Sequence, residues 1–540
     1  MMNSTRRSNI IKYSIMAAKY LFPIILSVIC MFNLHTKRYA TVILIEVFVI
    51  SIVSNMLLRK KYIAGYLFSS IFMLLVNAQC IVLFFGNNYI ELVMLSNLNF
   101  LGDLSGKVLE YGAGVLLVLL FSFFPVKEVE ITKNRDYKAL SIILVVELAI
   151  TMIYGSGYSP LYAYIDLLSQ KVENDKRSES IEQSEDKTNL FYKESIGDFV
   201  SKPEELEEKP NVILLFTEGI SQNVIDDPRD ITPNFKQLQE ESITFRGYYN
   251  HSFATLRGLQ GQLYSGYQMN NLDNNSLISI EDILNDNDYY TGFLNTEPNN
   301  KDFVIYLKNL GFDEVFGECD EYLGMQNSMS DKQAYEKLTD TVKMRHDEGK
   351  PYFLVMYTFG THASFQSMDE DYKDGSNNFL NKFYNVDYQF GEFFKEFQES
   401  ELSDNTILVM TGDHCTYGDS DFAEAFPEYS RDTSMVDEMP LYIWYKGVQP
   451  NEIQVHGRNS LDLAPTILDI MDIDGENYFL GTSLYDSKTS NLETIYECEG
   501  SYIDTNGGNI RILSDEEKIK YVEIVNDYFA AKKQTPIEME

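Results

Sequence analysis

The stretch "NVILLFTEGIS" at residues 211–221 is an apolar run of strand length that ends in a carboxylate, Glu218. A second stretch, "NTILVMTGDHCTYGD" at 405–419, has the same layout and ends in Asp413 and His414. Short apolar runs bounded by glycine and polar residues predict buried strands. In open α/β sheets, ligands bind beyond the carboxyl ends of the strands. We therefore expect these three polar side chains at one edge of a sheet.

From residue 210 onward, apolar runs alternate with amphipathic stretches, which predicts an α/β domain with a central, largely parallel sheet. The expected strands are 211–217, 291–295, 352–358, 405–411 and 440–446. The expected helices are 233–241, 255–264, 279–286, 301–310, 331–347, 379–399, 461–471 and 515–531.

The two halves of the chain differ in charge. Residues 1–155 carry 14 Lys and Arg against 8 Asp and Glu, whereas the rest of the 540-residue chain carries 30 against 72. The acidic half argues against nucleic acid as a partner, because phosphates would repel it. The five cysteines show no paired spacing, so they indicate neither a zinc-thiolate site nor a disulfide framework.

Residues 1–155 predict a polytopic helical membrane domain with five spans. Several of the apolar runs approach the roughly 20 residues that cross a bilayer. Lys and Arg concentrate in the N-terminus and in the second and fourth loops, which places the N-terminus in the cytoplasm and the C-terminal half outside the plasma membrane. A charged linker, 156–209, and a catalytic domain, 210–540, complete the predicted organisation. The five apolar runs that predict the membrane spans are 13–33, 40–58, 62–86, 110–126 and 139–155.

Four residues predict one metal site: Glu218, Thr255, Asp413 and His414. Taken singly, each has an ordinary explanation, because polar loops, turns and helix N-caps favour these residue types. Together, two carboxylates, an imidazole and a hydroxyl suit a divalent cation. A cation can lower the pKa of the hydroxyl, which makes Thr255 the expected nucleophile. Ser252 is the second choice.

His362 follows the expected strand 352–358 and lies in "FGTHASF". A single loop histidine is more often structural or exposed. At the predicted catalytic edge, however, it could bind a substrate phosphoryl oxygen or protonate a leaving group.

A series of motifs in the same order resembles the sulfatase-like branch of the alkaline phosphatase superfamily. The resemblance is closest to lipoteichoic acid synthase and related phosphoglycerol or phosphoethanolamine transferases, and it runs from about 210 to 482. The motifs are "PNVILLFTEGIS", "ITPNFKQLQEESITFRGYYNHS", "ATLRGLQGQL", "GFDEVFG", "FLVMYTFGTHASF", "FGEFFKEFQESELSDNTILVMTGDH", "MPLYIWYKG" and "GRNSLDLAPTILDIMDI".

The resemblance implies an extracellular sulfatase-like domain behind a membrane anchor. It implies that Glu218, Thr255, Asp413 and His414 hold one divalent ion, with Mn²⁺ favoured and Mg²⁺ or Zn²⁺ as alternatives. Thr255 would then take the head group of a phospholipid donor, phosphatidylglycerol or phosphatidylethanolamine, as a phosphothreonine. The group would pass to a surface glycan, glycolipid or teichoic-acid-type acceptor.

The chain departs from the family pattern at two places. Sulfatases carry Cys or Ser followed by x-Pro-x-Arg, whereas this chain has Thr255-Leu256-Arg257-Gly258. The stretch 292–303 lacks the His, Trp and Arg that hold glycerol phosphate in the synthases. The available polar substitutes are Asn295, Glu297 and Lys301, and Arg257 could supply a cationic contact to phosphate.

Two other functions stay open at this point. One is a phosphodiesterase or sulfatase of the same fold, with water as the acceptor. The other is a non-catalytic membrane protein that binds at the cell surface.

Overall fold

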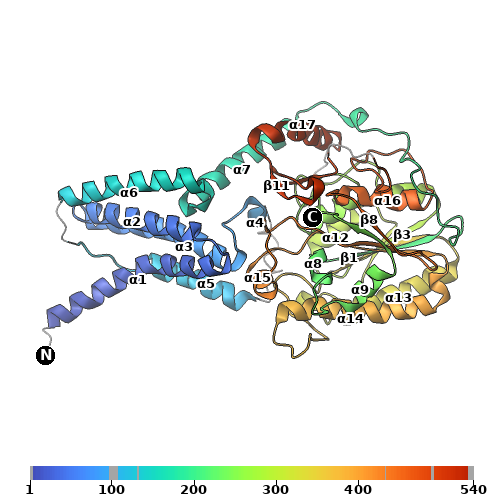
Figure 1. The fold of residues 1–540 in the computed structure, drawn as a ribbon, viewed down its shortest axis with the longest axis horizontal. Helices are drawn as coiled ribbons and strands as arrows, with labels where there is room; N and C mark the ends of the chain where they lie inside the picture. The colour runs from blue at the N-terminus through green and yellow to red at the C-terminus, as the bar shows by residue number, and fades with distance from the viewer. Residues whose placement is uncertain (1–3, 97–106, 130–132, 432, 488–491, 533–540) are drawn as a thin grey trace. The chain divides into compact units, whose positions relative to one another are not determined.

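A computed structural model describes residues 4–96, 107–129, 133–431, 433–487 and 492–532 (Figure 1). The chain forms two compact units. The first, a helical unit, holds most of the described residues up to Glu173 and also Gly418–Ser430. The second, an α/β unit, holds Asn174–Tyr417 and the described residues from Arg431 onward.

The five apolar runs are all helical. Among the described residues, four helical segments are long and apolar enough to cross a membrane, namely Ile10–Asn33, Arg38–Leu58, Tyr62–Gly86 and Tyr137–Tyr154. The fourth predicted run forms a shorter apolar helix of 15 residues. The helices are α1 (Ser4–Asn33), α2 (Arg38–Leu58), α3 (Tyr62–Gly86), α4 (Leu92–Ser96), α5 (Val108–Ser122), α6 (Lys133–Tyr154) and α7 (Pro160–Glu182).

Polar side chains join the helices of the first unit to one another. Lys19 Nζ on α1 donates to Ser70 Oγ on α3 at 3.1 Å. Asn77 Nδ2 on α3 donates to Ser122 Oγ on α5 at 2.9 Å. Such bonds hold helices together in an apolar medium, where hydrophobic burial gives little preference for helix over lipid.

The α/β unit contains an eight-stranded sheet in the order β4-β3-β5-β1-β6-β7-β2-β8. Only β7 runs against the others, so the sheet is largely parallel, as predicted. A second sheet has the order β11-β10-β9. The strands are β1 (Asn211–Thr217), β2 (Ile243–Arg246), β3 (Tyr290–Leu294), β4 (Glu314–Phe316), β5 (Tyr352–Thr358), β6 (Thr406–Gly412), β7 (Leu441–Trp444), β8 (Asn451–Gln454), β9 (Ile495–Cys498), β10 (Ser501–Asp504) and β11 (Arg511–Ile512).

Helices cover both faces of the large sheet, with α13 and α14 on one face and α16 on the other (Figure 1). The strands that the sequence did not predict, β2, β4 and β8 among them, are only three or four residues long and are not uniformly apolar. The helices are α8 (Gln222–Ile225), α9 (Pro233–Glu240), α10 (Thr255–Leu263), α11 (Ile280–Asp286), α12 (Lys301–Lys308), α13 (Asp331–Glu348), α14 (Asn378–Glu399), α15 (Ser420–Ala425), α16 (Leu463–Ile470) and α17 (Asp515–Ala531).

The predicted linker is more ordered than its composition suggests. Helix α7 extends to Glu182, and Arg177 donates to Glu497 at 2.9 Å and to Tyr502 at 3.0 Å. The charge pattern alone did not reveal this ion pair, because its acidic partner lies 320 residues further along the chain.

Candidate active site

The register of the sheet brings the two acidic motifs together. Strand β1 lies between β5 and β6, and Thr217 pairs with Thr358 on one side and with Gly412 on the other. Glu218 and Asp413 are each the next residue beyond that level. Parallel strands end at the same sheet edge, so both carboxylates leave it side by side.

Thr255 is the first residue of α10, and the residue before it is strained. Ala254 has φ 73°, a conformation that residues with a Cβ rarely adopt. Strain of this kind persists only where the surrounding structure enforces it, and it gathers at functional sites. Here it turns the chain so that the Thr255 hydroxyl donates to Glu218 Oε2 at 3.0 Å.

One face of α10 also holds the loop that carries Asp413. A Cβ on Gly258 would lie 2.1 Å from the carbonyl oxygen of Asp413, so only glycine allows this approach. Gln262 Nε2 donates to the carbonyl oxygens of Gly412 and Asp413, each at 3.0 Å. Residues 255, 258 and 262 share a helix face, since three and four residues make about one turn.

Glu218 is buried and accepts two hydrogen bonds on one oxygen. Its Oε2 receives the hydroxyl of Thr255 and, at 2.6 Å, the phenol of Tyr357. Burial raises the pKa of Glu218, and the charge of Asp413 raises it further. A cation beside these carboxylates would offset both effects.

Asp413 and His414 present one free ligand atom each. Asp413 Oδ1 accepts from the backbone N–H groups of Gly219 and His414, both at 2.8 Å, whereas the buried Oδ2 has no hydrogen-bond partner among the residues that the structure describes. His414 Nδ1 lies 2.7 Å from the carbonyl oxygen of Cys415, an acceptor that places the ring proton on Nδ1. That leaves the lone pair of Nε2 to face the carboxylates.

The pKa of His414 shows how negative this corner is. Burial favours the neutral ring, yet the carboxylates of Asp413 and Glu218 outweigh it and raise the pKa above its usual value. The site therefore attracts positive charge at the position of Nε2.

The distances fit a divalent cation. His414 Nε2 lies 3.5 Å from Glu218 Oε1 and 3.5 Å from Asp413 Oδ2, and ligand atoms of all three residues lie within 4.8 Å of one another. Bonds of about 2.0–2.2 Å to one ion separate adjacent ligand atoms by roughly 3–3.5 Å. The site combines the Oδ2 atom of Asp413, the oriented ring of His414 and the nearby hydroxyl of Thr255. This set of ligand atoms suits a divalent cation.

The comparison with protein families agrees with this geometry. Residues 210–473 match the model of the Sulfatase family. We refer to this matching segment as the sulfatase-family domain. The match covers the motifs from "PNVILLFTEGIS" to "LAPTILDIMDI", so the resemblance seen in the sequence is confirmed.

Relatives of the sulfatase-family domain include membrane enzymes. Lipoteichoic acid synthase 2 of Bacillus subtilis is 24% identical in an alignment of 315 positions that covers 51% of this chain and 47% of that protein. The chain thus spans about half the length of the curated relatives that it matches.

Two solved structures share the fold. The lipoteichoic acid synthase LtaP of Listeria monocytogenes aligns with TM-score 0.51 and 19% identity over 66% of this chain and 99% of that one. The membrane-integral phosphoethanolamine transferase A of Neisseria meningitidis aligns with TM-score 0.51 and 13% identity over 89% and 97%. This likeness confirms the predicted combination of apolar N-terminal helices with a sulfatase-like α/β domain.

In the sulfatase-family domain, the charges of Glu218 and His414 affect the pKa of His362. Burial lowers its pKa, and the charge of Glu218 partly opposes that effect. Within the described part of the chain, its Nδ1 has no hydrogen-bond partner.

Hydrogen bonds from two different side chains hold the loop that carries His362 in place. Thr361 Oγ1 donates to the carbonyl oxygen of Glu218 at 2.6 Å. The buried ammonium of Lys382, on α14, donates to the carbonyl oxygens of residues 361, 362 and 363 at 3.2, 2.7 and 3.2 Å.

The remaining sequence candidates make other contacts. Arg257 is fully buried, and its Nη2 lies 2.5 Å from Glu499, so its charge is already paired. Asn295 is buried and accepts from the backbone N–H of Glu297 at 2.8 Å, whereas Lys301 is exposed at the start of α12. The Ser252 hydroxyl is buried without a hydrogen-bond partner.

Sequence reasoning missed Tyr357 and Lys382. Tyr357 belongs to the apolar run "YFLVMYT" of β5, where an aromatic residue predicts only core packing. Lys382 belongs to an amphipathic helix, where a lysine is normally solvated. The full burial of both side chains is the signal that distinguishes them.

Proposed function

We propose that this protein is a membrane-anchored transferase that moves a phosphoglycerol or phosphoethanolamine head group from a phospholipid to a surface glycan or teichoic-acid-type acceptor. The observation that carries the proposal is the Thr255 hydroxyl, held 3.0 Å from a carboxylate oxygen of the Glu218–Asp413–His414 cluster. The two solved relatives, a lipoteichoic acid synthase and a phosphoethanolamine transferase, support the same reaction class.

Glu218, Asp413, His414 and Thr255 would hold one divalent cation, with Mn²⁺ as our choice. Such an ion supplies a lower hydroxyl pKa and offsets charge on phosphoryl oxygens. The carboxylate of Glu218 orients the Thr255 hydroxyl, because its Oε2 accepts that proton in a hydrogen bond. Tyr357 fixes the same oxygen from the other side.

The chemistry is two successive displacements at phosphorus. Thr255 Oγ1 gives up its proton and forms a bond to phosphorus, the bond from phosphorus to the diacylglycerol oxygen breaks, and that oxygen takes up a proton. The oxygen of an acceptor hydroxyl then gives up its proton and bonds to phosphorus, the bond from phosphorus to Thr255 Oγ1 breaks, and Oγ1 takes up a proton. His362, beside the cluster, is our proposed proton donor and phosphoryl contact.

The test uses the full-length protein with phosphatidylglycerol or phosphatidylethanolamine labelled in the head group. We expect mass spectrometry to find the labelled group on Thr255 and Thr255→Ala to lose it together with turnover, at least about a thousandfold. Ser252→Ala is the matched control and should retain both.

Two outcomes distinguish the alternatives. Labelled product that appears only as the free phosphate ester, even with a glycan acceptor present, would establish a hydrolase. If the wild-type chain never carries label and turns over neither lipid, the result would support the alternative of a non-catalytic surface protein.

A further inference from the structure

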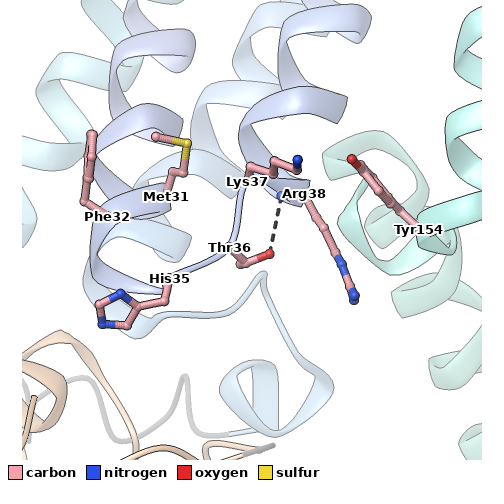
Figure 2. Close-up of a pocket in the computed structure, with 7 residues that line it drawn as sticks. All are labelled: Met31, Phe32, His35, Thr36, Lys37, Arg38 and Tyr154. Carbon is pink, nitrogen blue, oxygen red and sulfur yellow. Dashed lines mark hydrogen bonds between the residues drawn. The ribbon is translucent and has the colours of Figure 1, made fainter. Parts of the chain in front are cut away.

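The turn between α1 and α2 opens a cavity of about 600 Å³ in the helical unit. Residues 31, 32 and 35–38 line it together with Tyr154, which reaches toward it from α6 (Figure 2). The proposed chemistry at Thr255 uses none of these residues.

The cavity is cationic. His35, Lys37 and Arg38 line it, and none of its lining residues is acidic. Arg38 Nη1 donates to the Tyr158 hydroxyl at 2.7 Å, and its guanidinium lies 5.3 Å from the centre of that ring, which holds it in place. Lys37 is exposed and forms no ion pair with any described carboxylate.

The opposite wall of the cavity is apolar. Met31 and Phe32 end the α1 span, and the Phe32 side chain is 67% exposed. Ile29 and Ile25, one and two turns before Phe32 on α1, are 41% and 56% exposed. An apolar, outward-facing helix surface that leads into a cationic pocket suits a ligand with acyl chains and an anionic head.

The position of the pocket in the bundle is also informative. Helices α1 and α3 both end at this end of the bundle, and α2 starts there. At the end of α3, Phe85 accepts a hydrogen bond from Ser420 at 2.8 Å, within the segment Gly418–Ser430 that follows the "GDH" motif. The pocket thus lies at the end of the bundle to which the chain returns just after two proposed metal ligands.

We propose that Lys37 and Arg38 bind the phosphate of an anionic phospholipid head group, with Met31 and Phe32 against its acyl chains. This lipid-binding pocket is distinct from the site at Thr255, and its occupancy does not depend on the transfer reaction. If the N-terminus lies in the cytoplasm, as the sequence predicts, this basic loop lies on the outer side, where Lys and Arg are less frequent. Binding of an anionic head group would neutralise its charge there.

The test titrates the full-length protein in non-ionic detergent with dioleoylphosphatidylglycerol or dioleoylphosphatidylcholine, and native mass spectrometry counts the retained lipid. We expect a preference for phosphatidylglycerol that falls roughly tenfold in K37Q/R38Q. The matched control K60Q/K61Q removes the same charge from the opposite end of α2 and should change the affinity by less than about twofold. Lys37→Arg should bind like wild type, which separates charge from misfolding.

Three results would overturn the proposal. Equal losses in both double variants would indicate general attraction of basic loops to anionic lipid. Complete displacement of phosphatidylglycerol by millimolar glycerol phosphate would identify a site for free phosphate esters. Unchanged binding in K37Q/R38Q would place the lipid elsewhere. Thr255→Ala should bind normally, so a failed transferase proposal would leave this result intact.

Discussion

The helical unit and the α/β unit place apolar and polar groups in opposite ways. On α6, the side chains of Val145 and Leu148 are 67% and 64% exposed, and no residue of the segment Tyr137–Tyr154 is buried inside the structure. On β1, Leu214 is fully buried, and just beyond it Glu218 and Asp413 are 4% and 0% exposed. The first unit is apolar toward its surroundings, whereas the second buries charge.

This contrast shows that apolar composition carries two meanings in one chain. In the helices it indicates contact with lipid, because local hydrogen bonds satisfy the backbone of each span. In the strands it indicates a core whose purpose is to hold a few polar groups rigidly at one edge. Each of the following experiments tests one side of this contrast.

The largest effect should follow from removal of one buried charge. Asp413→Asn keeps an oxygen for the N–H groups of Gly219 and His414 but weakens the free ligand atom. We expect loss of bound metal, measured by elemental analysis, and a fall in transfer of about a thousandfold, because a metal ion contributes several kcal/mol to such transition states. Full metal content in the variant would contradict the proposed ligand set.

Leucine truncation compares the two units directly. Leu214→Ala should lower the free energy of unfolding by about 2–5 kcal/mol, because it leaves a cavity in a closed core. Leu148→Ala, on the exposed face of α6, should cost less than about 1 kcal/mol. Fluorescence of Trp444, the single tryptophan, reports unfolding of the α/β unit. Equal losses in the free energy of unfolding for the two variants would contradict this difference between the two units.

Lys382 tests whether a buried charge positions the catalytic loop. Lys382→Met removes the ammonium that donates to the carbonyl oxygens of residues 361–363, and we expect transfer to fall about ten- to a hundredfold with unchanged metal content. Lys382→Arg should recover part of it. The control Lys343→Met alters an exposed lysine on α13 and should have no effect. A loss of activity without any change in the pH profile set by His362 would argue for a merely structural role.

The smallest effect concerns pH. His251 is fully buried, and burial lowers its pKa to about 3 from 6.5. The unfolded chain therefore binds a proton that the folded chain excludes, so stability falls as the pH drops below about 6.5.

His251→Asn should make that fall shallower by about 1.4 kcal/mol per pH unit between pH 6 and 4.5, measured by denaturation at each pH. The exposed His35, in the helical unit, is the matched control, and His35→Asn should leave the slope unchanged. An unchanged slope in His251→Asn would show that other groups set the acid sensitivity.

Sequence reasoning placed the motifs correctly but not every neighbour. Glu218, Asp413 and His414 were predictable because strand ends in a parallel sheet share one edge. Arg257 was a candidate for a cationic contact to phosphate, and that role stays a prediction. On a helix, positions two apart face different directions, and the buried Arg257 forms an ion pair with Glu499.

The sequence alone predicted the apolar spans, the alternation of strands and helices and the family resemblance. These features could be predicted because periodicity and motif order are local properties of the chain. Only folding could add Tyr357 and Lys382 to the site and give the α1–α2 turn its cavity. Those features depend on side chains from separate elements that approach within hydrogen-bond distance, and Tyr357 reaches Glu218 across 139 residues. No local pattern encodes which distant group will fill a given buried position.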